Sequence, residues 1–294
     1  MTGTAFVIGA SGAVGRFVMP RLLAAGHAVV ALSRVEQPPQ DGVVWLRGGL
    51  DVSLSAPAVD ALICVGPLDH CVDWLESSRS PAPRRIVALS SMSADSKLDS
   101  PDAAERVLAA RLASAEQRLM AYAARHDIPA TVLRPTLIYG AGVDRSLTPI
   151  VRLALRSRVF PLLPGADGLR QPVHADDVAA ACVAALSDAA AGQVLPLGGG
   201  ERLSFAQMLK RVRAGLDRYT IPLPLNIFLL QTASRITGRG GAMLQRLKRD
   251  LVADNRLARE LLGVESRPFY PHGDCWRPVR MSAVVPPGAP VVAK

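Results

Sequence analysis

The feature that most constrains the fold is a set of three glycines near the start of the chain, spaced G-x-x-G-x-x-G. They are Gly9, Gly12 and Gly15, and the apolar run Thr4 to Ile8 directly precedes them. Residues 13–25 then carry apolar side chains at helical spacing. Such a strand, tight turn and helix presents backbone N–H groups and the positive end of the helix dipole to a phosphate. We therefore predict a dinucleotide pyrophosphate site formed by Gly9, Ser11, Gly12, Ala13, Val14 and Gly15.

Apolar runs of strand length recur after this loop, and a long helix rich in Ala, Arg and Glu is expected at 101–126. Strands that are apolar throughout are typical of a parallel sheet covered by helices on both faces. The alternation of strands and helices predicts an α/β fold, a Rossmann-type doubly wound parallel sheet. The runs that follow the loop cover residues 27–32, 43–46, 61–65, 85–89 and 129–133.

Beyond Pro135 the pattern changes to loops and helices with one short strand, which predicts a smaller, mostly helical C-terminal substrate lobe. We expect residues 1–170 to form the dinucleotide-binding Rossmann domain. Residues 171–284 are expected to form the C-terminal lobe, with the chain crossing between the two lobes. The Pro- and Gly-rich residues 285–294 are expected to form a flexible tail.

The positive charge is confined to one part of the chain. The 294 residues contain 34 Lys and Arg against 25 Asp and Glu, a net charge of +9. The first 200 residues contain 18 of each sign, so the excess lies in the last 94, with 16 basic and 7 acidic residues. Aromatic residues make up only 4% and no nucleic-acid-binding motif is present, so we expect no nucleic-acid partner. The charge instead predicts a small anionic or phosphate-bearing substrate.

The cysteines and the N-terminus indicate the compartment. Cys64, Cys71, Cys182 and Cys275 form no C-x-x-C pair and have no histidines near them at zinc-ligand spacing. They predict buried free thiols in a reducing compartment and no metal site. The first residues show no basic flank and no cleavage site, so we expect a cytoplasmic protein.

A run of sixteen uncharged residues lies between Arg218 and Arg235 in the basic C-terminal part. Two prolines and its short length argue against a transmembrane helix. Three interpretations stay open: packing within the lobe, a wall for an apolar substrate, and peripheral contact with an anionic membrane surface.

The end of the second predicted strand indicates which dinucleotide is bound. Ser33 and Arg34 stand where a site that prefers NAD would place Asp or Glu for the ribose hydroxyls. A carboxylate there repels a 2′-phosphate, whereas Ser33 and Arg34 favour it, so we predict NADP over NAD. Asp51, after the third strand, either accepts a hydrogen bond from the adenine amine or stabilises a turn.

Five segments, in the right order, resemble the NAD-dependent epimerase/dehydratase family, the extended and atypical short-chain dehydrogenases/reductases. The resemblance implies a nicotinamide cofactor across the carboxyl ends of the strands. Gly66 and Pro67 would pass along the ribose, and Arg134 and Pro135 would lie near the nicotinamide. The segments are the glycine loop, Val65-Gly66-Pro67, Leu89-Ser90-Ser91, Leu133-Arg134-Pro135-Thr136-Leu137-Ile138-Tyr139-Gly140 and Pro172-Val173-His174-Ala175-Asp176-Asp177-Val178-Ala179.

One departure from the family concerns catalysis. Family members usually carry Tyr-x-x-x-Lys on the long helix, but alignment on Ala115-Glu116 places Leu108 and Leu112 in these positions. Neither leucine can transfer a proton. Three other groups are candidates: Ser91 matches the family's active-site Ser/Thr, Lys97 follows it on a loop, and Tyr139 is a further acid.

The sequence therefore predicts an NAD(P)-dependent oxidoreductase or epimerase/dehydratase. Its substrate would be a sugar nucleotide or a related phosphate-bearing molecule, with lipid-linked molecules included. The alternative, favoured by Leu108 and Leu112, is an NADP-binding scaffold or sensor without turnover, which could also be membrane-peripheral. The acidic pair Asp176 and Asp177 precedes a run of small apolar residues, so we expect helix capping rather than catalysis. A homo-oligomer is compatible with the sequence.

Overall fold

The central element is a seven-stranded parallel sheet with strand order β11-β6-β5-β4-β1-β2-β3. The computed structural model describes residues 3–50, 54–225 and 247–279. The order confirms the predicted doubly wound sheet, because the chain winds from β1 first toward one edge and then toward the other. The strands are β1 Thr4–Ile8, β2 Ala28–Ser33, β3 Val43–Arg47, β4 Ala61–Cys64, β5 Ile86–Leu89, β6 Ala130–Pro135 and β11 Val194–Leu197.

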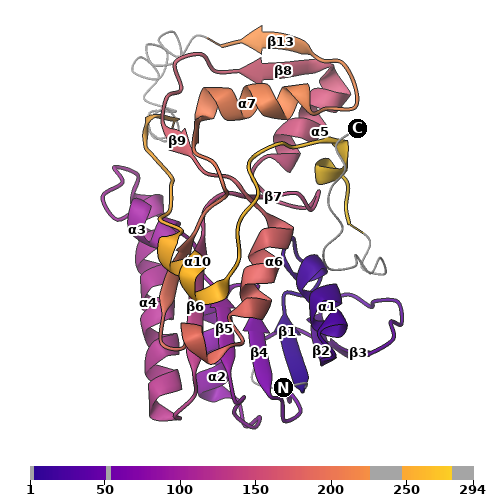
Figure 1. Ribbon diagram of the computed structural model, residues 1–294, viewed down its shortest axis with the longest axis vertical. Coiled ribbons are helices and arrows are strands. Elements are labelled where there is room, and N and C mark those ends of the chain that lie inside the picture. The colour runs from indigo at the N-terminus through magenta and orange to yellow at the C-terminus, as the bar shows by residue number, and fades with distance from the viewer. Residues whose placement is uncertain (1–2, 51–53, 226–246, 280–294) are drawn as a thin grey trace.

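Helices cover both faces of this sheet (Figure 1). Ala5 and Val7 of β1 pack into the same apolar cluster as α1 (Gly15–Ala24) and α6 (Ala175–Ala184). Phe6 and Ile8 point the other way, into the cluster of α2 (Leu68–Ser77) and α4 (Ala103–Arg125). Side chains alternate between the two faces of a strand, so a strand covered on both sides must be apolar at every position. The alternation explains why these strands appear in the sequence as continuous apolar runs.

A second lobe lies beyond the carboxyl ends of the strands (Figure 1). It contains α5 (Thr148–Ser157), β8 (Val159–Leu162), α7 (Phe205–Ala214) and β13 (Ile221–Pro224). It has its own apolar core, in which Phe160, Met208 and Phe269 are completely buried. Besides helices, its described part holds two-stranded sheets, which the sequence analysis did not predict. The remaining elements are α3 Ser93–Ser96, β7 Ile138–Tyr139, β9 Leu169–Arg170, β10 Val173–His174, η1 Asp188–Ala190, β12 Leu203–Ser204, α10 Arg256–Leu262 and η2 Gly273–Trp276.

The chain crosses between the lobes more than once. α5 and β8 precede residue 170 but belong to the second lobe, whereas α6 and β11 follow it and belong to the sheet domain. The boundary at residue 170 stays a prediction, and the expected tail at 285–294 lies outside the described residues. All four cysteines are buried free thiols, as expected. Among the described residues, no helix is both long and apolar enough to span a membrane.

Two carboxylates at the start of α6 pair with Arg267, which lies in the C-terminal part of the chain. Asp177 accepts hydrogen bonds from the backbone N–H (2.9 Å) and Nε (2.8 Å) of Arg267. Asp176 pairs with Nη2 of Arg21 on α1 (2.7 Å) and Nη2 of Arg267 (2.8 Å). Burial raises the pKa of Asp177, and Arg267 offsets this only in part. Burial acts in the same direction on Asp176, but Arg21 and Arg267 outweigh it and lower its pKa. His174, and not the acidic pair, caps α6 with its side chain, whereas Asp176 and Asp177 lie in the first turn of the helix and pair with arginines.

This contact predicts a large loss of stability when Asp177 is removed. Asp177→Ala leaves two donors of Arg267 without their acceptor in a partly buried site, which costs about 2 kcal/mol of unfolding free energy. Glu265→Ala is the control, because Glu265 forms an exposed pair with Arg259 (3.2 Å) and its loss leaves stability almost unchanged. Urea unfolding measures both. Equal midpoints for the two variants would contradict the structural role of Asp177.

Candidate functional site

The glycine loop passes so close to neighbouring backbone that side chains are excluded from it. Gly9 has a φ of +84°, and a Cβ there would lie 2.7 Å from the backbone N of Gly66. A Cβ on Gly15 would lie 2.3 Å from the carbonyl oxygen of Gly9. The N–H of Gly12 donates to the same carbonyl oxygen (2.9 Å), which closes the turn. A bare backbone turn at the start of a helix is the geometry in which backbone N–H groups bind a pyrophosphate in dinucleotide-binding folds.

The first turn of α1 keeps its positive electrostatic character. It contains no acidic residue, so nothing offsets the N-terminal helix dipole. Arg16 lies in this turn; its Nε donates to the carbonyl oxygen of Ser11 (3.0 Å) and its Nη1 to that of Val279 (2.5 Å). The side chain thereby fixes the loop against the C-terminal segment. Sequence reasoning missed Arg16, because its partner lies 263 residues away and no local pattern indicates the pair.

Ser33 and Arg34 lie at the carboxyl end of β2, as predicted. Ser33 is buried, and its Oγ donates to the carbonyl oxygen of Val35 (2.6 Å) and accepts from Nε2 of Gln37 (3.1 Å). Arg34 is exposed and, within the described part of the chain, forms no ion pair. Its guanidinium is therefore accessible to a ligand, whereas the Ser33 hydroxyl already serves the turn. Asp51 lies outside the described residues.

Ser91 and the pair Arg134 and Pro135 are brought side by side at the ends of β5 and β6. The N–H of Ser90 donates to the carbonyl oxygen of Leu133 (2.8 Å), and that of Met92 to the carbonyl oxygen of Pro135 (3.0 Å). The Oγ of Ser91 accepts a hydrogen bond from the backbone N–H of Ser93 (3.1 Å). Because the oxygen is the acceptor there, the hydroxyl proton of Ser91 stays free to donate.

Arg134 is held by two carboxylates. Its Nε donates to Oε1 of Glu116 on α4 (2.9 Å), and its Nη1 to Oδ2 of Asp95 on α3 (2.6 Å). Hydrogen bonding to Glu116 is the main cause that raises the pKa of Arg134 above its ordinary value. The guanidinium therefore fixes α3 and α4 against the end of β6. Sequence reasoning did not find the pair of Arg134 and Glu116, because it forms only where α4 packs beside the end of β6.

Lys97 forms an ion pair with Glu105, whose side chain is buried. The Nζ of Lys97 lies 2.9 Å from Oε1 of Glu105, and Oγ of Ser100 donates to Oε2 (2.6 Å). On α4, residues 105, 108, 112 and 116 are spaced by three or four positions and therefore share one face. The Lys97–Glu105 pair thus lies on the helix face that carries Leu108 and Leu112. Sequence reasoning missed Glu105, which a helical count back from Glu116 could have found.

Tyr139 lies in the core of the second lobe rather than beside Ser91. It is only 2% exposed, and its ring packs against Phe269 (4.8 Å between centroids) and His174 (5.1 Å). Burial is the main cause that raises the pKa of Tyr139 well above its ordinary value. The phenol therefore keeps its proton at neutral pH.

His174 is a buried neutral imidazole that caps α6. Its Nδ1 accepts from the backbone N–H of Asp176 (3.2 Å), and its ring packs edge-on against Phe17 (5.6 Å). Burial first, and then the charge of Arg267, lower the pKa of His174 from 6.5 to about 3. Gly140 has a φ of +100°, and a Cβ there would lie 2.1 Å from Nε2 of His174. Glycine is required at this contact because any side chain would displace the imidazole.

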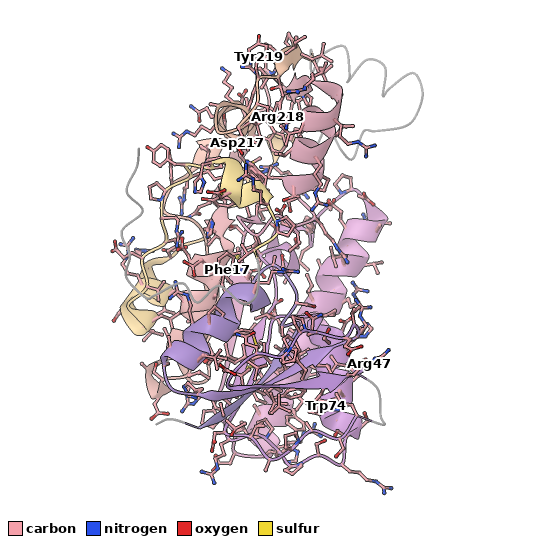
Figure 2. The ribbon with its side chains drawn as sticks, turned by 90° about the vertical axis from the view of Figure 1, so that its right-hand side faces the viewer. Phe17, Arg47, Trp74, Asp217, Arg218 and Tyr219 are labelled. Carbon is pink, nitrogen blue, oxygen red and sulfur yellow. The ribbon has the colours of Figure 1, made fainter. Side chains whose placement is uncertain are left out.

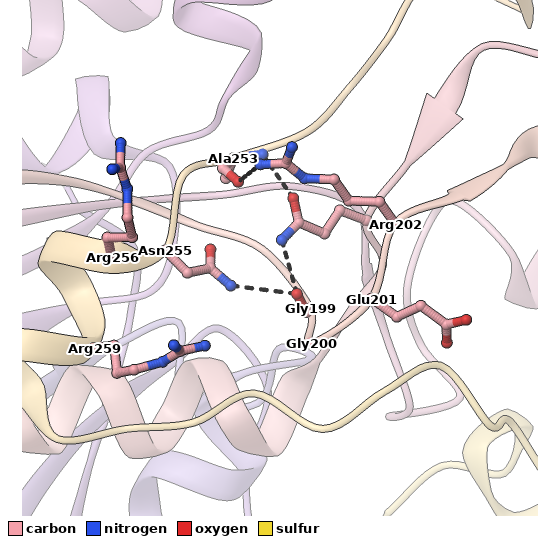
Figure 3. A pocket seen from close by; sticks show the side chains of 9 residues that line it. Gly199, Gly200, Glu201, Arg202, Ala253, Asn255, Arg256 and Arg259 are labelled. Atoms are coloured by element: carbon pink, nitrogen blue, oxygen red, sulfur yellow. Dashed lines mark hydrogen bonds between the residues drawn. The ribbon is translucent and has the colours of Figure 1, made fainter.

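A polar pocket of about 380 Å³ opens beside the loop that follows β11 (Figure 3). Its floor is a closed set of hydrogen bonds: Nε2 of Gln171 donates to the carbonyl oxygen of Gly199 (2.8 Å), and Oε1 accepts from Ala253 N–H (2.8 Å). The lining contains none of the site residues predicted from the sequence. It is formed mainly by the loop after β11 and by residues at the start of α10. The lining residues are Gln171, Gly199, Gly200, Glu201, Arg202, Ala253, Asn255, Arg256 and Arg259.

The sequence of this chain is similar to those of known epimerases and dehydratases. Residues 72–198 match the model of the NAD dependent epimerase/dehydratase family, which confirms the expected resemblance. A UDP-glucose 4-epimerase of Vibrio cholerae is 27% identical over 150 residues, which are 51% of this chain and 45% of that protein. The match therefore spans less than half the length of this relative.

Solved structures show the same fold over most of the chain. MoeE5 in complex with UDP-glucuronic acid and NAD has a TM-score of 0.70 at 20% identity, covering 91% of this chain and 95% of that one. The UDP-N-acetylglucosamine 4-epimerase from Bacillus cereus has a TM-score of 0.66 at 15% identity, covering 91% and 92%. At these identities the likeness establishes the fold.

The lowered pKa of His174 predicts a loss of stability on acidification. Below pH 6.5 the imidazole of the unfolded chain takes up a proton, whereas that of the folded chain stays neutral down to about pH 3. Folding therefore loses about 2 kcal/mol from this group between pH 7 and pH 5. His174→Asn keeps an acceptor at the cap and removes the titration, so the loss over this interval becomes smaller. Urea unfolding at both pH values measures it, and an unchanged pH dependence would refute the assignment.

Proposed function

We propose that the protein is an NAD(P)-dependent oxidoreductase or epimerase/dehydratase that acts on a sugar nucleotide. The match of residues 72–198 to the NAD dependent epimerase/dehydratase family supports this proposal. The observation that carries the proposal is the bare backbone turn of Gly9, Gly12 and Gly15 at the N-terminus of α1. A dinucleotide is the ligand whose pyrophosphate fits such a turn.

The dinucleotide would be held by the carboxyl ends of the central strands. Backbone N–H groups from Ser11 to Gly15 would bind the pyrophosphate, and Gly66 and Pro67 would lie along the ribose. Arg134 and Pro135 would flank the nicotinamide. The bound nicotinamide would supply a reversible hydride acceptor. The orientation of Arg134 would be fixed by Glu116 and Asp95, which already hold it in place.

Proton transfer is proposed for Ser91 and Lys97. The free hydroxyl proton of Ser91 would hydrogen-bond the reacting oxygen of the substrate and polarise it. The Nζ of Lys97 would donate or accept the proton of that oxygen, and Glu105 would position it. Two features favour Lys97 over Tyr139: the burial of the phenol, and the place of the Lys97–Glu105 pair on the α4 face of Leu108 and Leu112. The pair would replace the usual Tyr-x-x-x-Lys acid/base group.

Two arginines at the junction of the lobes support a phosphate-bearing substrate. The Nη2 of Arg249 donates to the carbonyl oxygen of Asp99, which follows α3, and Arg170 Nη1 donates to the carbonyl oxygen of Arg249 (2.6 Å). The Nη1 of Arg249 is buried and has no hydrogen-bond partner among the described residues. Arg249 as a whole is half-buried, and its guanidinium adds positive charge at this junction, which favours an anionic ligand. Solved relatives bind UDP-glucose and UDP-glucuronic acid, so a nucleotide diphosphate sugar is the substrate we propose.

We propose NADP as the preferred dinucleotide, because Arg34 offers an exposed guanidinium at the end of β2. Arg34→Ala should weaken NADPH binding about tenfold, the value of one charge-assisted hydrogen bond, and leave NADH binding unchanged. Arg79→Ala, an exposed arginine elsewhere on the sheet domain, is the control and should change neither. Calorimetric titration with NADPH and NADH measures the affinities. Tighter binding of NADH by the unaltered protein would refute the preference.

Turnover is tested by isotope exchange at the sugar ring with a panel of UDP-sugars and one polyprenyl-diphosphate-linked sugar. Ser91→Ala and Lys97→Met should each lower kcat about 100-fold, the usual contribution of a proton-transfer group. Ser93→Ala is the matched control, because only its backbone N–H contacts Ser91. Exchange with the lipid-linked sugar alone would assign that substrate. Dinucleotide binding without exchange on any member of the panel would favour the scaffold or sensor that Leu108 and Leu112 suggest.

A further inference from the structure

The far end of the second lobe exposes apolar side chains that the proposed chemistry does not use. Tyr219 is 76% exposed, and Ile221 and Leu223 of β13 are 57% and 47% exposed. β13 lies at one end of the long axis of the molecule, and Tyr219 and Arg218 are found at the same end after a quarter turn (Figures 1 and 2). Large apolar side chains gathered on one surface indicate a contact with another molecule or with a membrane.

Three arginines flank these side chains. The carbonyl oxygen of Arg158 accepts from the N–H of Ile221 (2.7 Å), so Arg158 lies beside the start of β13. The guanidinium of Arg213 donates to the carbonyl oxygen of Thr220 (2.8 Å) and lies 5.7 Å from the ring centroid of Tyr219. Arg218 precedes Tyr219 and is exposed.

The positive charge of these arginines is not offset nearby. Within the described ranges, none of Arg158, Arg213 and Arg218 pairs with a carboxylate. The neighbouring acid Asp217 is already paired with Arg277 (2.6 Å). We call Arg158, Arg213, Arg218, Tyr219, Ile221 and Leu223 the apical patch.

Arg158 occupies a backbone conformation that disfavours a side chain. It ends α5 with a φ of +61°, in the left-handed region. At the end of α10 the same conformation, with a φ of +63°, is occupied by Gly263. Glycine adopts it without strain, and helices commonly end on it for this reason. The chain thus carries a cation at the apical patch where glycine would fit the backbone better.

We propose that the apical patch docks on an anionic membrane surface. The apolar side chains of Tyr219, Ile221 and Leu223 would enter the boundary between head groups and acyl chains, and the arginines would pair with lipid phosphates. The positive charge complements the negative surface of phospholipid membranes, and it agrees with the excess of basic residues in the last 94 residues. Docking in this orientation leaves the sheet domain in water, because that domain lies at the other end of the long axis (Figure 1).

Sedimentation of the full chain with vesicles tests the proposal. We expect it to sediment with phosphatidylcholine vesicles that contain phosphatidylglycerol and to stay in solution with phosphatidylcholine alone. Arg158→Gly should weaken binding about fivefold, which corresponds to ~1 kcal/mol for one basic residue near an anionic surface. This variant relieves backbone strain, so it should unfold at the same urea concentration or a higher one and cannot lose binding by misfolding. The double variant Ile221→Ser/Leu223→Ser removes exposed side chains and should also weaken binding.

The matched control is Arg84→Gly, an exposed arginine that precedes β5 at the opposite end of the strands. It should bind vesicles like the unaltered protein. Three results would overturn the proposal: no sedimentation with anionic vesicles, equal weakening by Arg84→Gly, or unchanged binding in both patch variants. A dimer in gel filtration that Ile221→Ser/Leu223→Ser dissociates would also overturn it, because the patch would then bind a second copy of the chain.

Discussion

The close crossing of backbone at the turn between β1 and α1 is the constraint on which the rest of the molecule depends. Gly15 lies against the carbonyl oxygen of Gly9, and Gly9 lies against the backbone of Gly66 after β4. Substituents at Gly9 or Gly15 would push α1 away from the sheet or β4 away from β1. Because the crossing holds, the carboxyl ends of the central strands stay close together. The glycine loop, Arg34, Gly66, Ser91 and Arg134 all lie at or directly after those strand ends.

Ion pairs then fix the elements around that edge. Arg134 joins the end of β6 to α3 and α4 through Asp95 and Glu116, and Lys97 adds a second link between the loop after α3 and Glu105. Buried charges of this kind are costly unless they are fully paired, so they define one arrangement of the helices. On the face of α4 that carries Leu108 and Leu112, the paired residues Glu105 and Glu116 therefore lie one on each side of the two leucines. We propose that Lys97, positioned by Glu105, supplies the acid/base group where the usual tyrosine and lysine are missing.

The sequence predicts several secondary-structure elements of the sheet domain correctly. The predicted helix at 101–126 corresponds to α4 at Ala103–Arg125, and the run at 85–89 to β5 at Ile86–Leu89. These succeed because period and apolarity are local properties of the chain. The short strand after α6 was also expected, but not that β11 extends the main sheet by pairing with β6. Strand partners, like the contact of Arg16 with Val279, join residues far apart in sequence, and no local pattern encodes them.

The candidate site divides in the same way. The glycine loop could be predicted because its spacing reflects a requirement of the backbone. Ser91 could be predicted because it matches the active-site Ser/Thr of the family that the sequence resembles. Tyr139 has the right chemistry but lies in the apolar core of the second lobe, a property set by Phe269 and His174 from distant segments. Glu105 is the opposite case, because no motif in the sequence marks it, but the fold places its carboxylate beside Lys97.

We propose that a nicotinamide dinucleotide binds at the bare turn, with its reactive ring beside Ser91. A crystal structure of the protein grown with NADP⁺ and UDP-glucose tests this most directly. We predict pyrophosphate density within hydrogen-bond distance of the backbone N–H groups from Ser11 to Gly15, a 2′-phosphate beside Arg34, and the nicotinamide next to Ser91. Density for the dinucleotide anywhere else, or a nicotinamide ring separated from Ser91, would contradict it.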